Sequence, residues 1–232
     1  RASTSNRARV FNNMAIVDGT GYVYGFYPYY GQYYDMVYNS AYFKTTASYT
    51  VYGMYTYTAS GSYQNKVVNN YIHINSPGGT NYPVYVNYPS AFTQYDNNAY
   101  YMEGNGTLSY YWNGSTYTSL AALQSATTTV HDNSVYGDPY WISPTDLHSR
   151  SHVAYQAGTP FAGITDDYDG DSRSTTVPSI GCDEYPTPPN ENDMELVAVR
   201  FENATDKFAH IADPAEHVIR VSVANIGLSE NP

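Results

Sequence analysis

The residues best suited to chemistry lie in an acidic loop in the last third of the chain. Asp167, Asp169 and Asp171 alternate along this loop. Alternating carboxylates often bind Ca²⁺, which prefers oxygen ligands. In an EF-hand loop a glycine stands sixth and a glutamate closes the loop, whereas here Gly170 stands fourth and Pro178 holds the closing place. The three aspartates are therefore a candidate Ca²⁺ site of irregular form.

The same loop also has a structural interpretation. Arg173 follows the aspartates closely, and Asp183 and Glu184 come shortly afterwards. A guanidinium group pairs well with a carboxylate because two parallel hydrogen bonds fit its geometry. We expect Arg173 to pair with one of these two acids and favour this interpretation, with no cofactor beyond a candidate structural Ca²⁺. The predicted structural cap consists of Asp167, Asp169, Asp171, Arg173, Asp183 and Glu184.

Catalytic chemistry on a polysaccharide needs paired carboxylates, or a metal-bound carboxylate with a basic residue, on one surface. The first half of the chain is poor in such groups, and its candidates are Asp18, Asp35, Asp96, Glu103, Lys44 and Lys66. Asp35 and Asp96 fall two repeats apart and at different positions within the repeat. The histidines show no spacing typical of metal ligands. We therefore assign no catalytic residue and expect a protein that is not an enzyme.

A fourfold repeat must position all of these residues. Short apolar or aromatic runs lead into an asparagine at Asn12, Asn39, Asn69 and Asn97, at intervals of 27, 30 and 28 residues. Repeats of this length with β-rich composition are typical of a parallel β-solenoid. We predict an all-β fold, a right-handed parallel β-helix. Asparagine tolerates the left-handed bend between strands and can bond its counterpart in the next coil, so these four are predicted to form a ladder.

The chain divides into three predicted regions. Strand-like runs fill each repeat, and a short helix is expected at 118–126. The β-helix is predicted to span 1–185, with a C-terminal cap at about 119–185, and a proline-rich linker follows at 186–193. Residues 194–232 contain two strand-like runs, at 195–201 and 217–224. They are too short for a complete immunoglobulin-like sandwich, so we expect a partial sandwich or a segment that exchanges strands with another chain.

Several motifs resemble one known family. The loop reads Asp167-Tyr168-Asp169-Gly170-Asp171-Ser172-Arg173, and it is followed by Ile180-Gly181-Cys182-Asp183-Glu184-Tyr185. Upstream are Ser-Leu-Ala-Ala-Leu-Gln at 119–124, Asp-Pro at 138–139 and Thr-Asp-Leu-His at 145–148. Together they resemble the end of secreted, Bacteroidetes-type right-handed β-helix surface proteins with pectin-lyase-like repeats. The resemblance implies that an immunoglobulin-like module begins after residue 193. Cys182 departs from the family, which usually has alanine there.

Composition and charge disfavour several classes of function. The net charge is −11, and residues 141–232 hold five basic and fifteen acidic residues, so binding to nucleic acid is disfavoured. No apolar run is long enough to span a membrane. Cys182 is the single cysteine, which excludes an intrachain disulfide. The chain begins with Arg1 and shows no signal-peptide pattern, so we interpret it as a processed piece of a precursor. Its tyrosine-rich, lysine-poor composition favours an extracellular or cell-surface location.

Two further expectations concern the tyrosines and the candidate glycosylation sites. Twenty-nine tyrosines, nearly all before residue 141, are expected to stack in ladders, to offer platforms for sugars, or to form a contact surface for self-assembly. Three sequons, at Asn105, Asn113 and Asn203, are candidates for N-glycosylation.

The sequence therefore predicts a non-enzymatic extracellular structural protein, a segment of a surface filament or adhesin that self-associates through β-strand contacts. Asn12 lies so close to Arg1 that the first coil is expected to have an uncovered end. The alternative is a module that binds or degrades polysaccharides, with carbohydrate as its partner.

Overall fold

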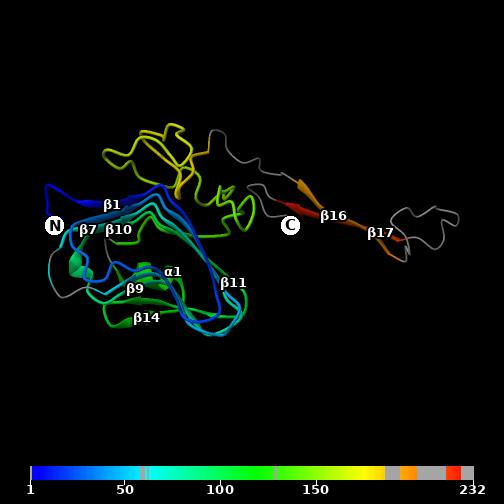
Figure 1. The fold of residues 1–232 in the computed structure, drawn as a ribbon, viewed down its shortest axis with the longest axis horizontal. Helices are drawn as coiled ribbons and strands as arrows, with labels where there is room; N and C mark the ends of the chain where they lie inside the picture. The colour runs from blue at the N-terminus through cyan, green and yellow to red at the C-terminus, as the bar shows by residue number, and fades with distance from the viewer. Residues whose placement is uncertain are drawn as a thin grey trace. The chain divides into compact units, whose positions relative to one another are not determined.

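The computed structural model describes residues 2–57, 61, 63–127 and 130–185 in full, together with the backbone of 194–202 and 218–225. The chain divides into two units, residues 1–186 and 187–232. The first unit is a parallel β-solenoid of about four coils (Figure 1). The predicted all-β fold and parallel β-helix are thus confirmed.

Each coil contributes one strand to each of three sheets. The first sheet contains β1 (Ala8–Phe11), β4 (Tyr34–Val37), β7 (Asn65–Val68) and β10 (Phe92–Asp96). The second contains β2 (Met14–Gly19), β5 (Ser40–Thr45), β8 (Tyr71–Asn75), β11 (Ala99–Glu103) and the short β15 (Val135–Tyr136). The third contains β3 (Val23–Phe26), β6 (Val51–Thr56), β9 (Thr80–Val86), β13 (Tyr110–Trp112) and β14 (Ser115–Tyr117), with β12 (Thr107–Leu108) beside β9.

Alternation along the strands builds the core. In the second sheet Ala41, Ile72 and Tyr100 stand in register on successive coils and are all buried. Similar stacks from the other sheets meet them inside the solenoid, which removes a continuous apolar column from water. Val37 is also buried, but it packs with Ile164 outside the coils.

The fourth coil is closed by the short helix that the sequence predicts. This helix is α1 (Leu120–Ala126), and a one-turn 3-10 helix, η1 (Pro89–Ala91), precedes it in the chain. Ser119 caps α1, because its hydroxyl accepts a hydrogen bond from the main-chain N–H of Ala122 at 3.1 Å. Leu120 and Leu123 enter the core. Beyond β13 the sheet continues only into the antiparallel strand β14, so the parallel stacking ends there.

Residues 137–185 form a long segment that we call the strap. It has no regular strand and contains two isolated bridges, Ser143 to Asp146 and Asp166 to Ser172. The strap lies beside the corner between the first and second sheets, drawn from green to yellow in Figure 1. The sequence predicted that 119–185 as a whole caps the end of the β-helix. That prediction was wrong for the strap, which follows the side of the coils.

The second unit is described by its backbone alone. Strand β16 (Met194–Glu202) pairs antiparallel with β17 (Val218–Asn225). Both strands fall where the sequence predicts them, while the predicted linker at 186–193 lies outside the described residues. No helix among the described residues is long and apolar enough to cross a membrane.

Candidate functional site

A ladder of asparagine amides runs along the corner between the first two sheets. The Nδ2 group of each ladder residue donates to the Oδ1 atom of the next, from Asn13 to Asn39 at 2.8 Å, Asn39 to Asn70 at 2.8 Å and Asn70 to Asn98 at 3.0 Å. Ser134 ends the ladder, because its hydroxyl accepts from the main-chain N–H of Asn98. The amide dipoles therefore satisfy one another in a buried corner.

The predicted ladder of Asn12, Asn39, Asn69 and Asn97 was wrong at three of its four positions. Only Asn39 belongs to the ladder. The residue before each of the last three ladder members bends the chain with a positive φ, and in the second coil that residue is Tyr38, with φ 55°. The other coils have two consecutive asparagines at the bend, and the second of them belongs to the ladder. In the second coil the corresponding residues are Tyr38 and Asn39, so an alignment on a shared asparagine matches Asn39 with the first asparagine of each other coil, one residue too early.

Asn12, Asn69 and Asn97 instead hold the strap. Their Nδ2 groups donate to main-chain carbonyls of the strap, at Asp166, Thr159 and Ala157 respectively, over 2.6, 2.7 and 3.0 Å. Tyr38 does the same in the second coil, since its hydroxyl donates to the carbonyl of Thr159 at 2.8 Å. The strap therefore runs from the fourth coil back to the first and is held at every coil by a side chain of the bend.

Arg173 anchors the strap at the first coil. Its Nη2 group donates to Asn12 Oδ1 at 3.0 Å and to the carbonyls of Gly181 and Cys182 at 3.1 and 2.9 Å. Nη1 lies 3.5 Å from Glu184, the pair that the sequence predicts, although a single contact replaces the expected bidentate one. The guanidinium also lies over the Tyr38 ring, 3.8 Å from its centroid.

The acidic loop is organised around Asp167. Its Oδ1 atom accepts the N–H groups of Asp169 and Asp171, both at 2.9 Å, and Oδ2 accepts that of Glu184 at 2.9 Å. Asp167 is buried, and these donors occupy its oxygens in the manner of a structural turn. Binding of Ca²⁺ by the three aspartates stays a prediction for calorimetric titration.

A different trio brings its ligand atoms together. Atoms of His148, Asp169 and Asp183 lie within 4.8 Å of one another. The His148 ring bonds Asp146 through Nδ1 and Asp169 through Nε2, the latter at 2.6 Å. Burial opposes the charge on His148, but these hydrogen bonds raise its pKa to about 9. Both nitrogens then carry protons at neutral pH, so the trio is an ion-pair cluster in this structure, and a metal would bind it only by displacing a proton from His148.

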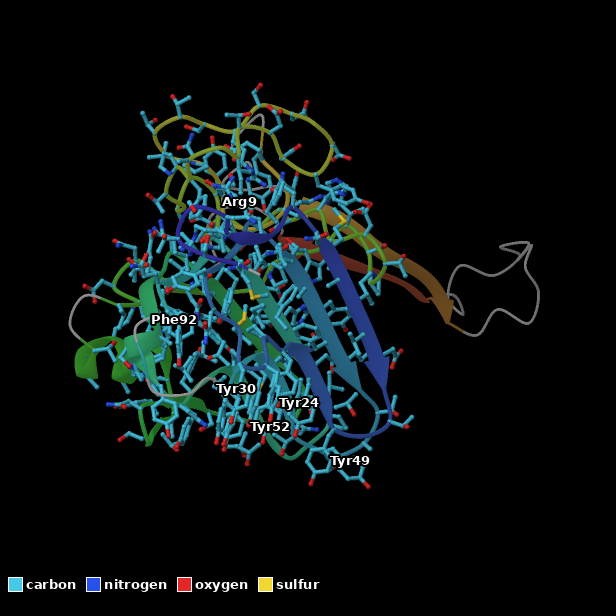
Figure 2. The ribbon with its side chains drawn as sticks, turned by 60° about the vertical axis from the view of Figure 1, so that its left-hand side comes forward. Arg9, Tyr24, Tyr30, Tyr49, Tyr52 and Phe92 are labelled. Carbon is cyan, nitrogen blue, oxygen red and sulfur yellow. The ribbon has the colours of Figure 1, made fainter. Side chains whose placement is uncertain are left out.

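Outward-facing tyrosines form columns on the third sheet. Tyr24, Tyr52 and Tyr82 stand in register, and their ring centroids are 4.9 and 5.4 Å apart at interplanar angles of 13° and 8°. A second column continues from Tyr85 to Tyr111 at 4.1 Å. Figure 2 shows Tyr24, Tyr30, Tyr49 and Tyr52 on the same side of the coils. The predicted ladder arrangement is confirmed. Stacked rings cover one another's faces, so the column presents ring edges and hydroxyls to solvent.

A cleft on the outside of the second sheet was missed by sequence reasoning. Tyr42, His73 and Tyr101 stand in register on three coils, with Glu103 two residues beyond Tyr101. The strap residues 138–144 form the opposite wall, and the cavity measures about 310 Å³. It is lined by Tyr42, His73, Glu103, Asp138, Tyr140, Trp141, Ile142, Ser143 and Pro144. The spacing of 31 and 28 residues between the three registered positions was the available signal, but it emerges only once the ladder is correctly aligned.

Three hydrogen bonds organise this cleft. Trp141 donates its indole N–H to His73 Nδ1 at 2.9 Å. Glu103 Oε1 accepts from the amide of Asn75 and from the Tyr42 hydroxyl at 3.4 Å. The coil register brings His73 close to Glu103, although the two residues lie in different coils.

Two of the three predicted glycosylation sites lie in exposed turns. Asn105 follows β11, and Asn113 lies between β13 and β14 with φ 51°. Asn203 lies outside the described residues. Both turns are accessible to a modifying enzyme, and glycosylation stays a prediction.

Comparisons with known proteins assign no family, because no family model, curated protein or solved structure matches the chain.

Proposed function

We propose that this chain is a non-enzymatic structural protein of the cell exterior, a segment of a surface filament or adhesin whose copies join through β-strand contacts. The observation that supports it best is the set of strand edges on β1, β2 and β3 that face away from the second coil. Within the described residues no strand pairs with the outer edges of β1, β2 or β3. Exposed strand edges readily recruit another chain.

The first coil also exposes apolar side chains. Val10, Phe11, Ile16 and Val17 are all exposed, and beside them a cavity of about 390 Å³ opens into the core between Val10, Phe26 and Met36. The column of tyrosines ends here too, with Tyr24 exposed. A partner strand would extend the sheets and cover this apolar surface.

The opposite end favours a different contact. Helix α1 packs into the core of the fourth coil, and the antiparallel strand β14 ends the parallel stacking of the third sheet there. The strand pair β16–β17 has two edges of its own, and two isolated strands are marginally stable. We place β16–β17 of one copy against the first-coil edge of the next. Such a head-to-tail contact is heterologous, and it yields a filament wherever the rotation between copies does not close into a ring.

Other parts of the proposal follow from composition and resemblance. Buried acids among the described residues serve structure, as when Asp35 binds Arg7 at 2.6 Å and Asp167 binds three main-chain amides. The resemblance to secreted β-helix surface proteins, with residues 194–232 as the start of an immunoglobulin-like module, agrees with a surface filament.

Electron microscopy of three variants tests this assignment. Ile16→Lys places a charge on the open edge, and deletion of 187–232 removes the donor strands. Val177→Lys is the matched control, because Val177 and Ile16 are both 42% exposed and Val177 lies on the strap. We expect filaments from the wild type and the control only. Filaments from the edge variant and the deletion, or none from the wild type, would overturn the proposal.

A further inference from the structure

The cleft on the second sheet contains a buried hydrogen-bond donor that has no acceptor. His73 is 5% exposed, and its Nδ1 atom receives the indole N–H of Trp141. An indole nitrogen only donates, so Nδ1 must carry the lone pair. Burial lowers the pKa of His73 to about 3, and the ring is therefore neutral at physiological pH. Its single proton is then on Nε2.

The Nε2–H group has nothing to bind within the described residues. It is buried without a hydrogen bond, and the nearest carboxylate atom, Glu103 Oε1, lies 3.5 Å away. That oxygen already receives Asn75 and Tyr42. A buried donor without an acceptor is unfavourable, so an ordered water or a ligand hydroxyl is expected between His73 and Glu103.

We propose that this cleft binds one pyranose ring of an uncharged saccharide, with a sugar hydroxyl between His73 Nε2 and Glu103. A hydroxyl oxygen accepts from Nε2–H while its own proton goes to the carboxylate, which satisfies both groups at once. An ammonium group offers only donors and a bare metal ion offers no acceptor, so either would leave Nε2–H unpaired. An anionic sugar meets Glu103 and Asp138, and no lysine or arginine lines the cleft.

The walls of the cleft fit the same class of ligand. Tyr42, Tyr140 and Trp141 line it, and aromatic side chains pack against the apolar face of a sugar ring. Trp141 is held by its bond to His73, so its ring is positioned before a ligand arrives. The cavity of about 310 Å³ has room for one sugar ring with its hydration. This site is independent of the proposed assembly, because it uses none of the first-coil edge residues.

Tryptophan fluorescence reports on this cleft selectively. The chain has two tryptophans, and Trp112 is 5% exposed within the solenoid core, whereas Trp141 lines the cleft. The full chain is titrated with neutral gluco-, manno- and xylo-oligosaccharides, with oligogalacturonate as the anionic probe and oligoglucosamine as the cationic probe. The titration extends to about 10 mM, where even weak sugar sites fill. We expect a saturable change with at least one neutral series, and no such change in Trp141→Phe.

Substitutions at two carboxylates test whether Glu103 recognises the sugar hydroxyl. Glu103→Gln retains the shape of the side chain but weakens the acceptor, and we expect about tenfold weaker binding or worse. Asp18→Asn is the matched control, because Asp18 is an exposed acid on the same sheet that pairs with Lys44, and its affinity should equal that of the wild type. Circular dichroism melts check that both variants fold. Absence of binding by every neutral series, equal affinity of Glu103→Gln, equal binding of oligogalacturonate, or binding of oligoglucosamine alone would overturn the proposal.

Discussion

Asn70 is the residue whose replacement tests the ladder most severely. Its side chain is fully buried and makes five hydrogen bonds. Oδ1 accepts from the main-chain N–H and the Nδ2 group of Asn39, at 3.2 and 2.8 Å. Nδ2 donates to Met36 O, Asn98 Oδ1 and Val68 O, at 2.9, 3.0 and 3.1 Å. Asn70→Ala removes all five bonds.

The expected cost follows from what the substitution leaves behind. Each intramolecular hydrogen bond contributes about 0.5–1.5 kcal/mol net, and a buried group left without a partner costs about 1–3 kcal/mol. The carbonyls of Met36 and Val68 can accept hydrogen bonds from other donors. The main-chain N–H and the Nδ2 group of Asn39, in contrast, both lose the Oδ1 acceptor of Asn70 and face the new void. We therefore expect a loss of about 3–5 kcal/mol in the free energy of unfolding, at the high end for single substitutions.

Urea denaturation followed by tryptophan fluorescence measures this loss. Asn69→Gly is the informative neighbour, because glycine accepts the φ of 59° and only the bonds to Thr159 disappear. We expect it to cost about 1–2 kcal/mol. The exposed Asn105→Ala controls for loss of an asparagine elsewhere and should change little. If Asn69→Gly cost more than Asn70→Ala, the ladder would have the wrong register.

Three further predictions concern the strap. His148 has a folded pKa of about 9 against an ordinary value of 6.5, so the stability that it contributes is complete below pH 6.5 and is lost as pH rises through 9. The urea midpoint of the wild type should therefore fall between pH 6.5 and 9, and that of His148→Gln should change less over the same range. Cys182 is buried, and burial raises its pKa to about 12, so iodoacetamide at pH 8 should label it only as fast as the protein unfolds; rapid labelling of native protein would contradict its placement. Arg173→Leu removes the guanidinium bonds to the carbonyls of Gly181 and Cys182 and to Asn12, so it should speed proteolysis within the strap. Loss of the exposed Arg150 should not, and equal rates would show that Arg173 does not fasten the strap.

The repeat unit and its strands were predictable because they depend on local patterns. Ile72 and Ile74 alternate with His73 and Asn75 in their strand, and Ser119 marks the start of the helix with its own side chain. The ladder register was not predictable by matching asparagines. Tyr38 occupies the bend of the second coil, and only the three-dimensional bend shows that it corresponds to Asn12.

The path of the strap and the cleft depend on contacts between distant residues. Asn12 bonds the carbonyl of Asp166, which is 154 residues away, and Trp141 bonds His73, which is 68 residues away. Neither pairing leaves a periodic trace in the sequence. A pair between Arg173 and Asp183 or Glu184 was predictable because opposite charges stand close together in the sequence, whereas the choice of Glu184 depends on the folded loop.

Hydrogen exchange of the first-coil strands at increasing protein concentration tests the proposed assembly most directly. Amides of β1, β2 and β3 that face outward exchange freely in an isolated copy and become protected when a second chain pairs with them. We predict protection that rises with concentration in these strands and in β16–β17, and that disappears in Ile16→Lys. Filaments that form while exchange in the first coil stays unchanged would contradict the account.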